Sequence, residues 1–235
     1  MSLEILKLSR GVEGLFIKNS RFNTTLISYN FYLPLQKDTV ASNALLPFIL
    51  TSCSKKYPDF SRLNYKLAKL YGARLNATAE KYGDYQLLKM TISVINDKFS
   101  FDEESLVKSA SQLLLNLIFE PNLVDNAFTA EDLEREKRKA IEHIKGEISE
   151  KRVFAKKRLI EEMYKNEAYG LPKCGTIEDV QNITGESLFG TWKNMLESAF
   201  VRVQVVGKKV PEGFFEDITE RFGQIKRKNI SVNFA

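Results

Sequence analysis

The stretch that decides the fold is residues 44–58, Ala44-Leu-Leu-Pro-Phe-Ile-Leu-Thr-Ser-Cys-Ser-Lys-Lys-Tyr-Pro58, followed after a short helical pattern by Gly72-Ala-Arg-Leu-Asn-Ala-Thr78. The first part is apolar nearly all round, which predicts a deeply buried helix. Gly72 ends the next helix and opens a strand of small side chains. Between Ala44 and Leu50 there is no acid, base or nucleophile. This part of the buried helix therefore carries no side chain for acid–base or metal chemistry.

Composition limits the class of protein. The chain has 235 residues, of which 43% are hydrophobic and 28% charged, and its net charge is +5. This chain is long enough to bury a proper core, and its charge content is typical of folded soluble proteins rather than disordered ones. Its lysines alternate with acids, as in Glu134-Arg-Glu-Lys-Arg-Lys139. That pattern is typical of a solvated helix face, so we expect no nucleic-acid partner.

The cysteines and the N-terminal residues indicate in which cellular compartment the protein is expected. Cys53 and Cys174 are far apart and have no paired spacing, which fits reduced thiols. Cys174 lies in a loop pattern and is expected to be a free surface thiol. The start, Met1-Ser-Leu-Glu-Ile5, is not a signal peptide, and the apolar run Ala44 to Leu50 is too short for a membrane span. We expect a cytoplasmic protein with no membrane partner.

Hydrophobic periodicity predicts an α+β fold in which helices cover an antiparallel sheet. The strand from Thr24 to Leu35 alternates, and its other face, with Ser28, Asn30 and Tyr32, is expected to be solvated. With no linker, residues 1–235 are expected to form a single domain. The other expected strands are 15–18, 75–81, 85–95 and 200–207. The expected helices start at 38 or 42 and run to 54, and then span 59–70, 102–117, 129–149, 152–165, 184–198 and 212–222.

Five short motifs occur in order along the chain: Ser54-Lys-Lys-Tyr-Pro58, Gly72-Ala-x-Leu-Asn-Ala77, Glu134-x-Glu-Lys137, Tyr169-Gly-Leu-Pro-x-x-Gly-Thr176 and Val205-Val-Gly207. In this order and spacing the chain resembles the pitrilysin/insulinase family of zinc peptidases, which includes the mitochondrial processing peptidases. The resemblance implies an α+β half-unit, with an antiparallel sheet covered by helices. It also implies that this chain is the N-terminal half of a longer protein.

The resemblance also shows what is missing. Family members bind zinc through an inverted His-x-x-Glu-His motif, and the alignment places Ala44 and Phe48 at the two histidines and Pro47 at the general base. Alanine and phenylalanine have no lone pair for a metal. The family's third ligand, a Glu seven residues after an earlier Glu, falls on His143 when counted from Glu136. We therefore expect no catalytic residues, no metal and no cofactor.

The same alignment gives two structural expectations. His143 would stand alone, so we interpret it as a half-exposed residue beside the apolar stripe of its helix. Phe48, with Leu45, Leu46 and Ile49, is expected to be core, filling the space where active relatives keep their metal.

Because we expect no catalysis, the function that we expect from this chain is peptide binding. In active relatives an extended peptide adds to the strand equivalent to Leu75, Asn76, Ala77 and Thr78, and these residues are our candidate peptide-binding site. The plain alternative is an ordinary sheet strand with small residues for packing. The resemblance implies a partner, either an active zinc peptidase paralogue in a heterodimer or a second half-unit of the same gene product. Two alternatives stay open: a zinc-dependent peptidase with an unrecognised ligand set, and a purely structural assembly subunit.

Overall fold

A six-stranded sheet organises the structure, a computed structural model that describes residues 2–101 and 105–228. The spatial order of its strands is β1-β2-β8-β3-β5-β4, and every neighbouring pair is antiparallel except β2 and β8. The strands are β1 (Ser2–Ser9), β2 (Val12–Lys18), β3 (Thr24–Pro34), β4 (Arg74–Tyr82), β5 (Tyr85–Ile95) and β8 (Phe200–Gly207). The order places β4 at one edge of the sheet.

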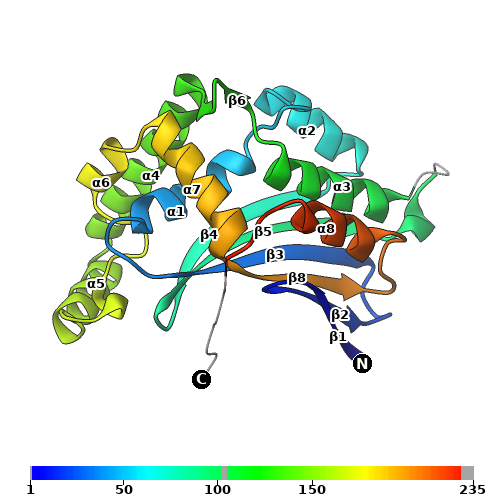
Figure 1. Cartoon of the computed structure of the whole chain (residues 1–235), viewed down its shortest axis with the longest axis horizontal. Coiled ribbons are helices and arrows are strands. Elements are labelled where there is room, and N and C mark those ends of the chain that lie inside the picture. Colours follow the sequence, from blue (N-terminus) through cyan, green and yellow to red (C-terminus); the bar gives the residue numbers. More distant parts are fainter. Residues whose placement is uncertain (1, 102–104, 229–235) are drawn as a thin grey trace.

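The helices gather over one face of this sheet, with α3 and α8 above one end and α1, α4 and α7 toward the other (Figure 1). This arrangement confirms the predicted α+β class. The helices are α1 (Val40–Leu50), α2 (Phe60–Lys69), α3 (Leu106–Phe119), α4 (Ala130–Ser149), α5 (Lys151–Met163), α6 (Ile177–Gln181), α7 (Gly185–Ser198) and α8 (Phe214–Gly223). Two short strands, β6 (Leu123–Val124) and β7 (Ala127–Phe128), and the 3₁₀ turns η1 (Asp97–Phe99) and η2 (Ala168–Gly170) complete the chain.

Local capping sets several helix starts where the sequence predicted them. Asp59 Oδ1 accepts a hydrogen bond from the Arg62 amide at 2.8 Å, and Thr184 forms a capping box with Ser187. The sequence did not predict β1, β6, β7 or α6, and it placed the end of α1 too late, at Ser54 instead of Leu50. Residues 102–104, where α3 was expected to start, lie outside the described residues.

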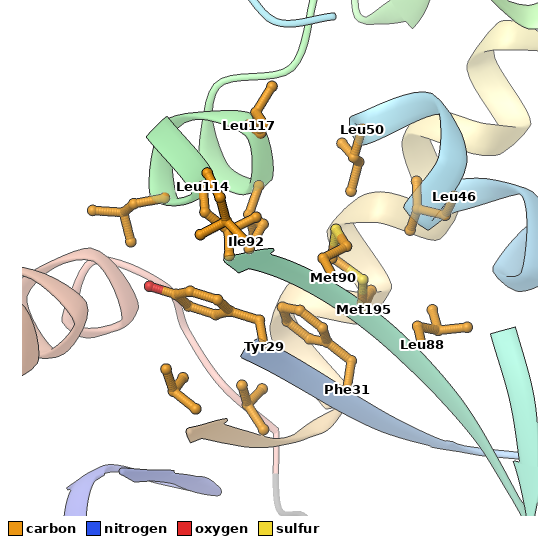
Figure 2. Close-up of a cluster of buried hydrophobic side chains, with 14 of the residues drawn as sticks. Tyr29, Phe31, Leu46, Leu50, Leu88, Met90, Ile92, Leu114, Leu117 and Met195 are labelled. Carbon is orange, nitrogen blue, oxygen red and sulfur yellow. The ribbon is translucent and has the colours of Figure 1, made fainter. Parts of the chain in front are cut away.

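The core lies between the sheet and the helices (Figure 2). Alternate residues of β3 point into it, and Tyr29 and Phe31 are fully buried. This period-2 pattern is why β3 and β5 form strands with one apolar face. Side chains of α1, α3 and α7 fill the other side of the core, namely Leu46, Leu50, Leu114, Leu117 and Met195.

The opposite face of β3 is also buried, contrary to the expectation of a solvated row. Ser28 is 2% exposed, Asn30 3% and Tyr32 8%. The Asn30 amide donates to Ser28 Oγ at 3.2 Å and to the Arg202 carbonyl at 2.9 Å. Ser28 Oγ donates to Gln204 Oε1 of β8 at 3.4 Å, and the Tyr32 ring contacts those of Tyr82 and Phe200. Side chains of other strands therefore cover this face, although Figure 1 shows the helices on the other one. The sequence pattern identified the polar row but not how neighbouring strands would cover it.

Helix α1 is apolar on nearly all sides because it is surrounded. It contacts β4 and β5 on one side and α4, α6 and α7 on others. Pro47 lies inside the last turn of the helix, and the amide of Thr51 donates to its carbonyl at 3.1 Å. Among the described residues, no helix has both the length and the apolar character needed to cross a membrane.

Candidate functional site

Ala44 and Phe48 lie one turn apart on α1 and face a cavity of about 450 Å³, which we call the α1–α4 cavity. His143 of α4 and Thr78 of β4 also line it. The structure thus brings together three of the four positions where the resemblance implies zinc chemistry. The remaining lining residues are Ala41, Leu45, Ala79, Glu80, Glu136, Lys139, Ala140, Lys173, Cys174 and Val180.

Other predicted site residues lie elsewhere. Pro47 is buried and does not line the cavity. Leu75, Asn76 and Ala77 lie further along β4, and Asn76 is exposed. Asn76 is in register with Thr91 of β5 rather than with the buried Met90, so its side chain is on the sheet face away from the helices. The cavity therefore adjoins β4 at residues 78–80, beyond the predicted centre of the strand.

Phe48 is not core, and that expectation is wrong. Its side chain is 39% exposed, whereas Leu45, Leu46 and Ile49 are buried as expected. The side of α1 that carries Ala44 and Phe48 faces the cavity, while its other sides pack against sheet and helices. The ring of Phe48 therefore forms part of a cavity wall and is not packed into the core.

Several charged groups around the cavity are paired with one another. Glu136 is 4% exposed and accepts hydrogen bonds from Lys139 Nζ at 2.8 Å and Arg135 Nε at 3.3 Å. Glu147, one turn after His143, lies 3.0 Å from Lys173 Nζ and 3.3 Å from His143 Nε2. These ion pairs leave the cavity with a mainly apolar inner surface.

The pKa of Glu147 reflects this pairing. Burial alone would raise the pKa of its carboxyl, but the hydrogen bond and charge of Lys173, with the charges of Lys157 and His143, hold it below the usual range. Glu147 therefore stays ionised and paired. Across the described residues, His, Cys, Asp and Glu side chains form no group of three or more that could hold a metal ion.

The loop from Tyr169 to Thr176 forms one wall and is fastened to the sheet. Lys81 Nζ donates to the carbonyls of Tyr169 at 2.7 Å and Leu171 at 2.9 Å. Gly175 has φ +70°, and a Cβ there would lie 2.7 Å from that of Ala41. A side chain at this position would therefore push the loop away from α1. The sequence motif thus corresponds to close contact between this loop and α1.

Cys174 in this loop is not the surface thiol that the sequence indicated. It is partly buried and lines the cavity. Burial raises the pKa of its thiol, and the charge of Lys173 only partly opposes that effect. A thiol with a raised pKa is a poor nucleophile, so the geometry offers no catalytic cysteine here.

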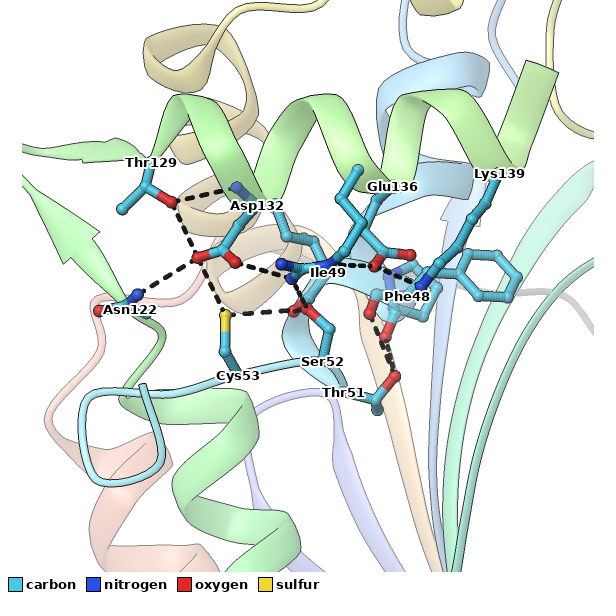
Figure 3. A network of polar contacts seen from close by, with 12 residues as sticks. Phe48, Ile49, Thr51, Ser52, Cys53, Asn122, Thr129, Asp132, Glu136 and Lys139 are labelled. Atoms are coloured by element: carbon cyan, nitrogen blue, oxygen red, sulfur yellow. Dashed lines mark hydrogen bonds and ion pairs between the residues drawn. The ribbon is translucent and has the colours of Figure 1, made fainter. Parts of the chain in front are cut away.

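A polar network holds the end of α1 against the first turn of α4 (Figure 3). Asp132, 7% exposed, accepts hydrogen bonds from Thr129 Oγ1 at 2.8 Å, Asn122 Nδ2 at 3.2 Å and Arg135 Nη2 at 2.7 Å. Cys53 Sγ donates to the same carboxylate at 3.2 Å. Burial, and next the charge of Asp132, raise the pKa of Cys53 to about 12. The network sets the separation of two cavity walls.

Sequence reasoning missed several cavity residues. Lys139 and Ala140 follow Glu136 at helical spacings that place them on one face with His143, which is a readable signal. Glu80 comes soon after the quoted strand motif. Lys173 lies inside the quoted loop motif, whereas Val180 has no such signal, because only the packing of α6 against α1 brings it to the cavity.

The comparisons bear on identity. A curated relative, the probable inactive metalloprotease YmfF of Bacillus subtilis (strain 168), is 32% identical over 197 residues, which cover 84% of this chain and 46% of that protein. Among solved structures, a conserved protein from Enterococcus faecalis V583 matches with a TM-score of 0.86 and 23% identity, over 99% of this chain and 54% of that one. No family model matches the sequence.

A second solved structure, the peptidase M16 inactive domain from Pseudomonas fluorescens, has a TM-score of 0.74 and 14% identity, over 100% of this chain and 53% of that one. The chain spans about half the length of the curated relative it matches. The fold, the order of the motifs and the similarity to an inactive relative all indicate the same family. The chain belongs to the pitrilysin (M16) family of zinc peptidases as a non-catalytic half-unit.

Proposed function

We propose that this half-unit forms one wall of the substrate chamber in a peptidase assembly and holds an extended peptide along the edge of β4. The single observation that carries the proposal is that β4 is the last strand of the sheet and that its edge adjoins the α1–α4 cavity. An edge strand presents N–H and C=O groups to which another extended chain adds.

The register of the β4–β5 hairpin identifies which backbone groups face outward. Tyr82 and Tyr85 pair across a two-residue loop that contains Gly83 with φ +56°. The residues that flank a two-residue hairpin loop exchange hydrogen bonds, and bonded and non-bonded pairs then alternate along the strands. By this alternation Leu75, Ala77 and Ala79 direct their backbone groups away from β5. A peptide would pair with these residues.

The proposed partner is an active zinc peptidase paralogue in a heterodimer, or a second half-unit of the same gene product, in the cytoplasm. Support comes from length, because this chain covers 46% of the curated relative and 54% and 53% of the two solved chains. Each therefore has room for a second unit of similar size. Cleavage would come from the partner, and this chain would position the substrate in peptide processing or turnover.

Hydrogen exchange tests the proposal. An extended peptide added to the chain, alone and with an added active M16 peptidase, should slow exchange at the amides of residues 75, 77 and 79. Protection confined to the helices, or absent altogether at saturating peptide, would reject peptide holding and favour the structural assembly subunit. Stoichiometric zinc in the purified protein together with cleavage by this chain alone would favour the peptidase with an unrecognised ligand set.

A further inference from the structure

The α1–α4 cavity has a mainly apolar inner surface. Ala44 and Phe48 stand on one wall, Ala140 on the opposite helix, and Val180 on α6. We propose that this cavity is a specificity pocket for one apolar side chain, aliphatic or aromatic, of the peptide that pairs with β4. This inference rests on the proposed peptide-holding function and adds the chemical class of residue that is selected.

The position of the cavity relative to the strand supports this assignment. Ala79 is in register with the buried Leu88 of β5, so its side chain is on the helix-covered face of the sheet. Side chains of directly opposed residues in neighbouring strands lie on the same face. A peptide residue opposite Ala79 would therefore direct its side chain toward the helices, into the cavity. The small Ala79 side chain leaves room for it.

Charge pairing disfavours an acidic side chain in the cavity. Lys139 is bonded to Glu136 at 2.8 Å and Lys173 to Glu147 at 3.0 Å, so these lysines already have carboxylate partners. An acidic peptide side chain entering between them would lose water without gaining a comparable ion pair, and a basic one would also lose its water of hydration. An apolar side chain has no strong hydration to lose, and its burial is favourable because it removes apolar surface from water.

The size of the cavity also fits. A volume of about 450 Å³ is at the small end of the range for ligand sites, about 300–1,000 Å³. It is large enough to admit a Leu or Phe side chain. The ring of Phe48, 39% exposed, gives this side chain an apolar surface to contact.

Peptides that differ at one position test the inference. We would titrate the 235-residue chain with acetyl-Thr-Thr-Xaa-Thr-Thr-amide, where Xaa is Leu, Phe, Ala, Glu or Lys, and follow exchange at residues 75–79 in parallel. Leu and Phe should bind about tenfold or more tighter than Ala, because each buries several additional carbon atoms. Glu and Lys should bind no better than Ala.

Ala140→Leu places a larger side chain in the cavity from its partly exposed helix wall and should reduce the preference for Leu and Phe while residues 75–79 stay protected. The matched control is Ala155→Leu, the same change at an exposed position of α5, which should keep the preference. Equal binding of all five peptides with protection at 75–79 would overturn the pocket and leave peptide holding intact. No protection with any peptide would overturn both.

Discussion

Cys53 Sγ donates a hydrogen bond to Asp132 Oδ2 at 3.2 Å and so joins the end of α1 to the first turn of α4, two segments 79 residues apart in the sequence. Both helices line the α1–α4 cavity. The shape of the cavity therefore depends on a buried carboxylate that must be ionised to accept all of its hydrogen bonds.

The first prediction concerns acid stability. Burial would raise the pKa of Asp132, but hydrogen bonds from Thr129, Arg135, Cys53 and Asn122 hold it below the usual range. A carboxyl with a lowered folded-state pKa contributes stability that is fully present above its unfolded pKa of about 3.9 and is lost as the pH falls through the folded value. Asp132→Asn should lower the free energy of unfolding at pH 7 by about 2 kcal/mol, as expected for lost hydrogen bonds to a charged group.

Urea denaturation at several pH values measures this effect. The difference in unfolding free energy between wild type and Asp132→Asn should shrink as the pH falls below about 4. Asp125→Asn is the matched control, since Asp125 is exposed and asparagine accepts its positive φ. A constant difference down to pH 2 would show that ionisation of Asp132 contributes nothing.

The second prediction concerns thiol reactivity. With a pKa of about 12, Cys53 is a thiolate in only about one molecule in ten thousand at pH 8. It is also 2% exposed. Iodoacetamide at pH 8 should therefore modify Cys53 only in urea, as read by peptide mass spectrometry. Rapid modification in native buffer would mean that the Cys53–Asp132 contact opens frequently.

The third prediction follows from the corrected position of Phe48. Because its ring is 39% exposed, Phe48→Ala should lower the free energy of unfolding by about 1 kcal/mol or less. Phe154→Ala, at a 40% exposed helical position, should behave similarly, whereas Phe31→Ala in the core should cost about 3–5 kcal/mol. A loss at Phe48 as large as at Phe31 would restore the plug interpretation.

The fourth prediction concerns metal. With no ligand at positions 44, 47 and 48, we expect no zinc in the purified chain and no peptidase activity from it alone. Metal binding that is linked to folding would make stability sensitive to chelator. The melting temperature should therefore be the same with and without EDTA. A drop of several degrees, with zinc found by elemental analysis, would contradict the prediction.

The fifth prediction concerns Asn76, which is exposed next to the outward-facing backbone of β4. Its amide both donates and accepts, so it is suited to a neighbouring peptide backbone. Asn76→Ala should weaken peptide binding by about 0.5–1.5 kcal/mol, one hydrogen bond, in a calorimetric titration. Asn64→Ala, at an exposed position of α2, should leave affinity unchanged. Equal affinities for wild type and Asn76→Ala would remove Asn76 from the site.

Much of the fold was predictable because its signals are local. Caps at Asp59, Thr129 and Thr184 act within a few residues, and the structure has helices starting at each. The edge strand β1 was missed because its apolar residues Leu3, Ile5 and Leu6 do not share one face, and they are exposed. Without one buried face, a strand lacks the alternation that predicts it.

By itself, the sequence determined that positions 44, 47 and 48 bear no metal ligand, because the chemistry of a side chain does not depend on its surroundings. Only the tertiary structure decided what surrounds these three residues. Whether Phe48 fills the core or lines a cavity depends on which side of α1 the sheet and α4 leave uncovered. That is settled by contacts between segments far apart in the chain, such as Cys53 with Asp132 and Gln86 with Lys173. Local periodicity has no information about such contacts, because it extends over only one or two helical turns.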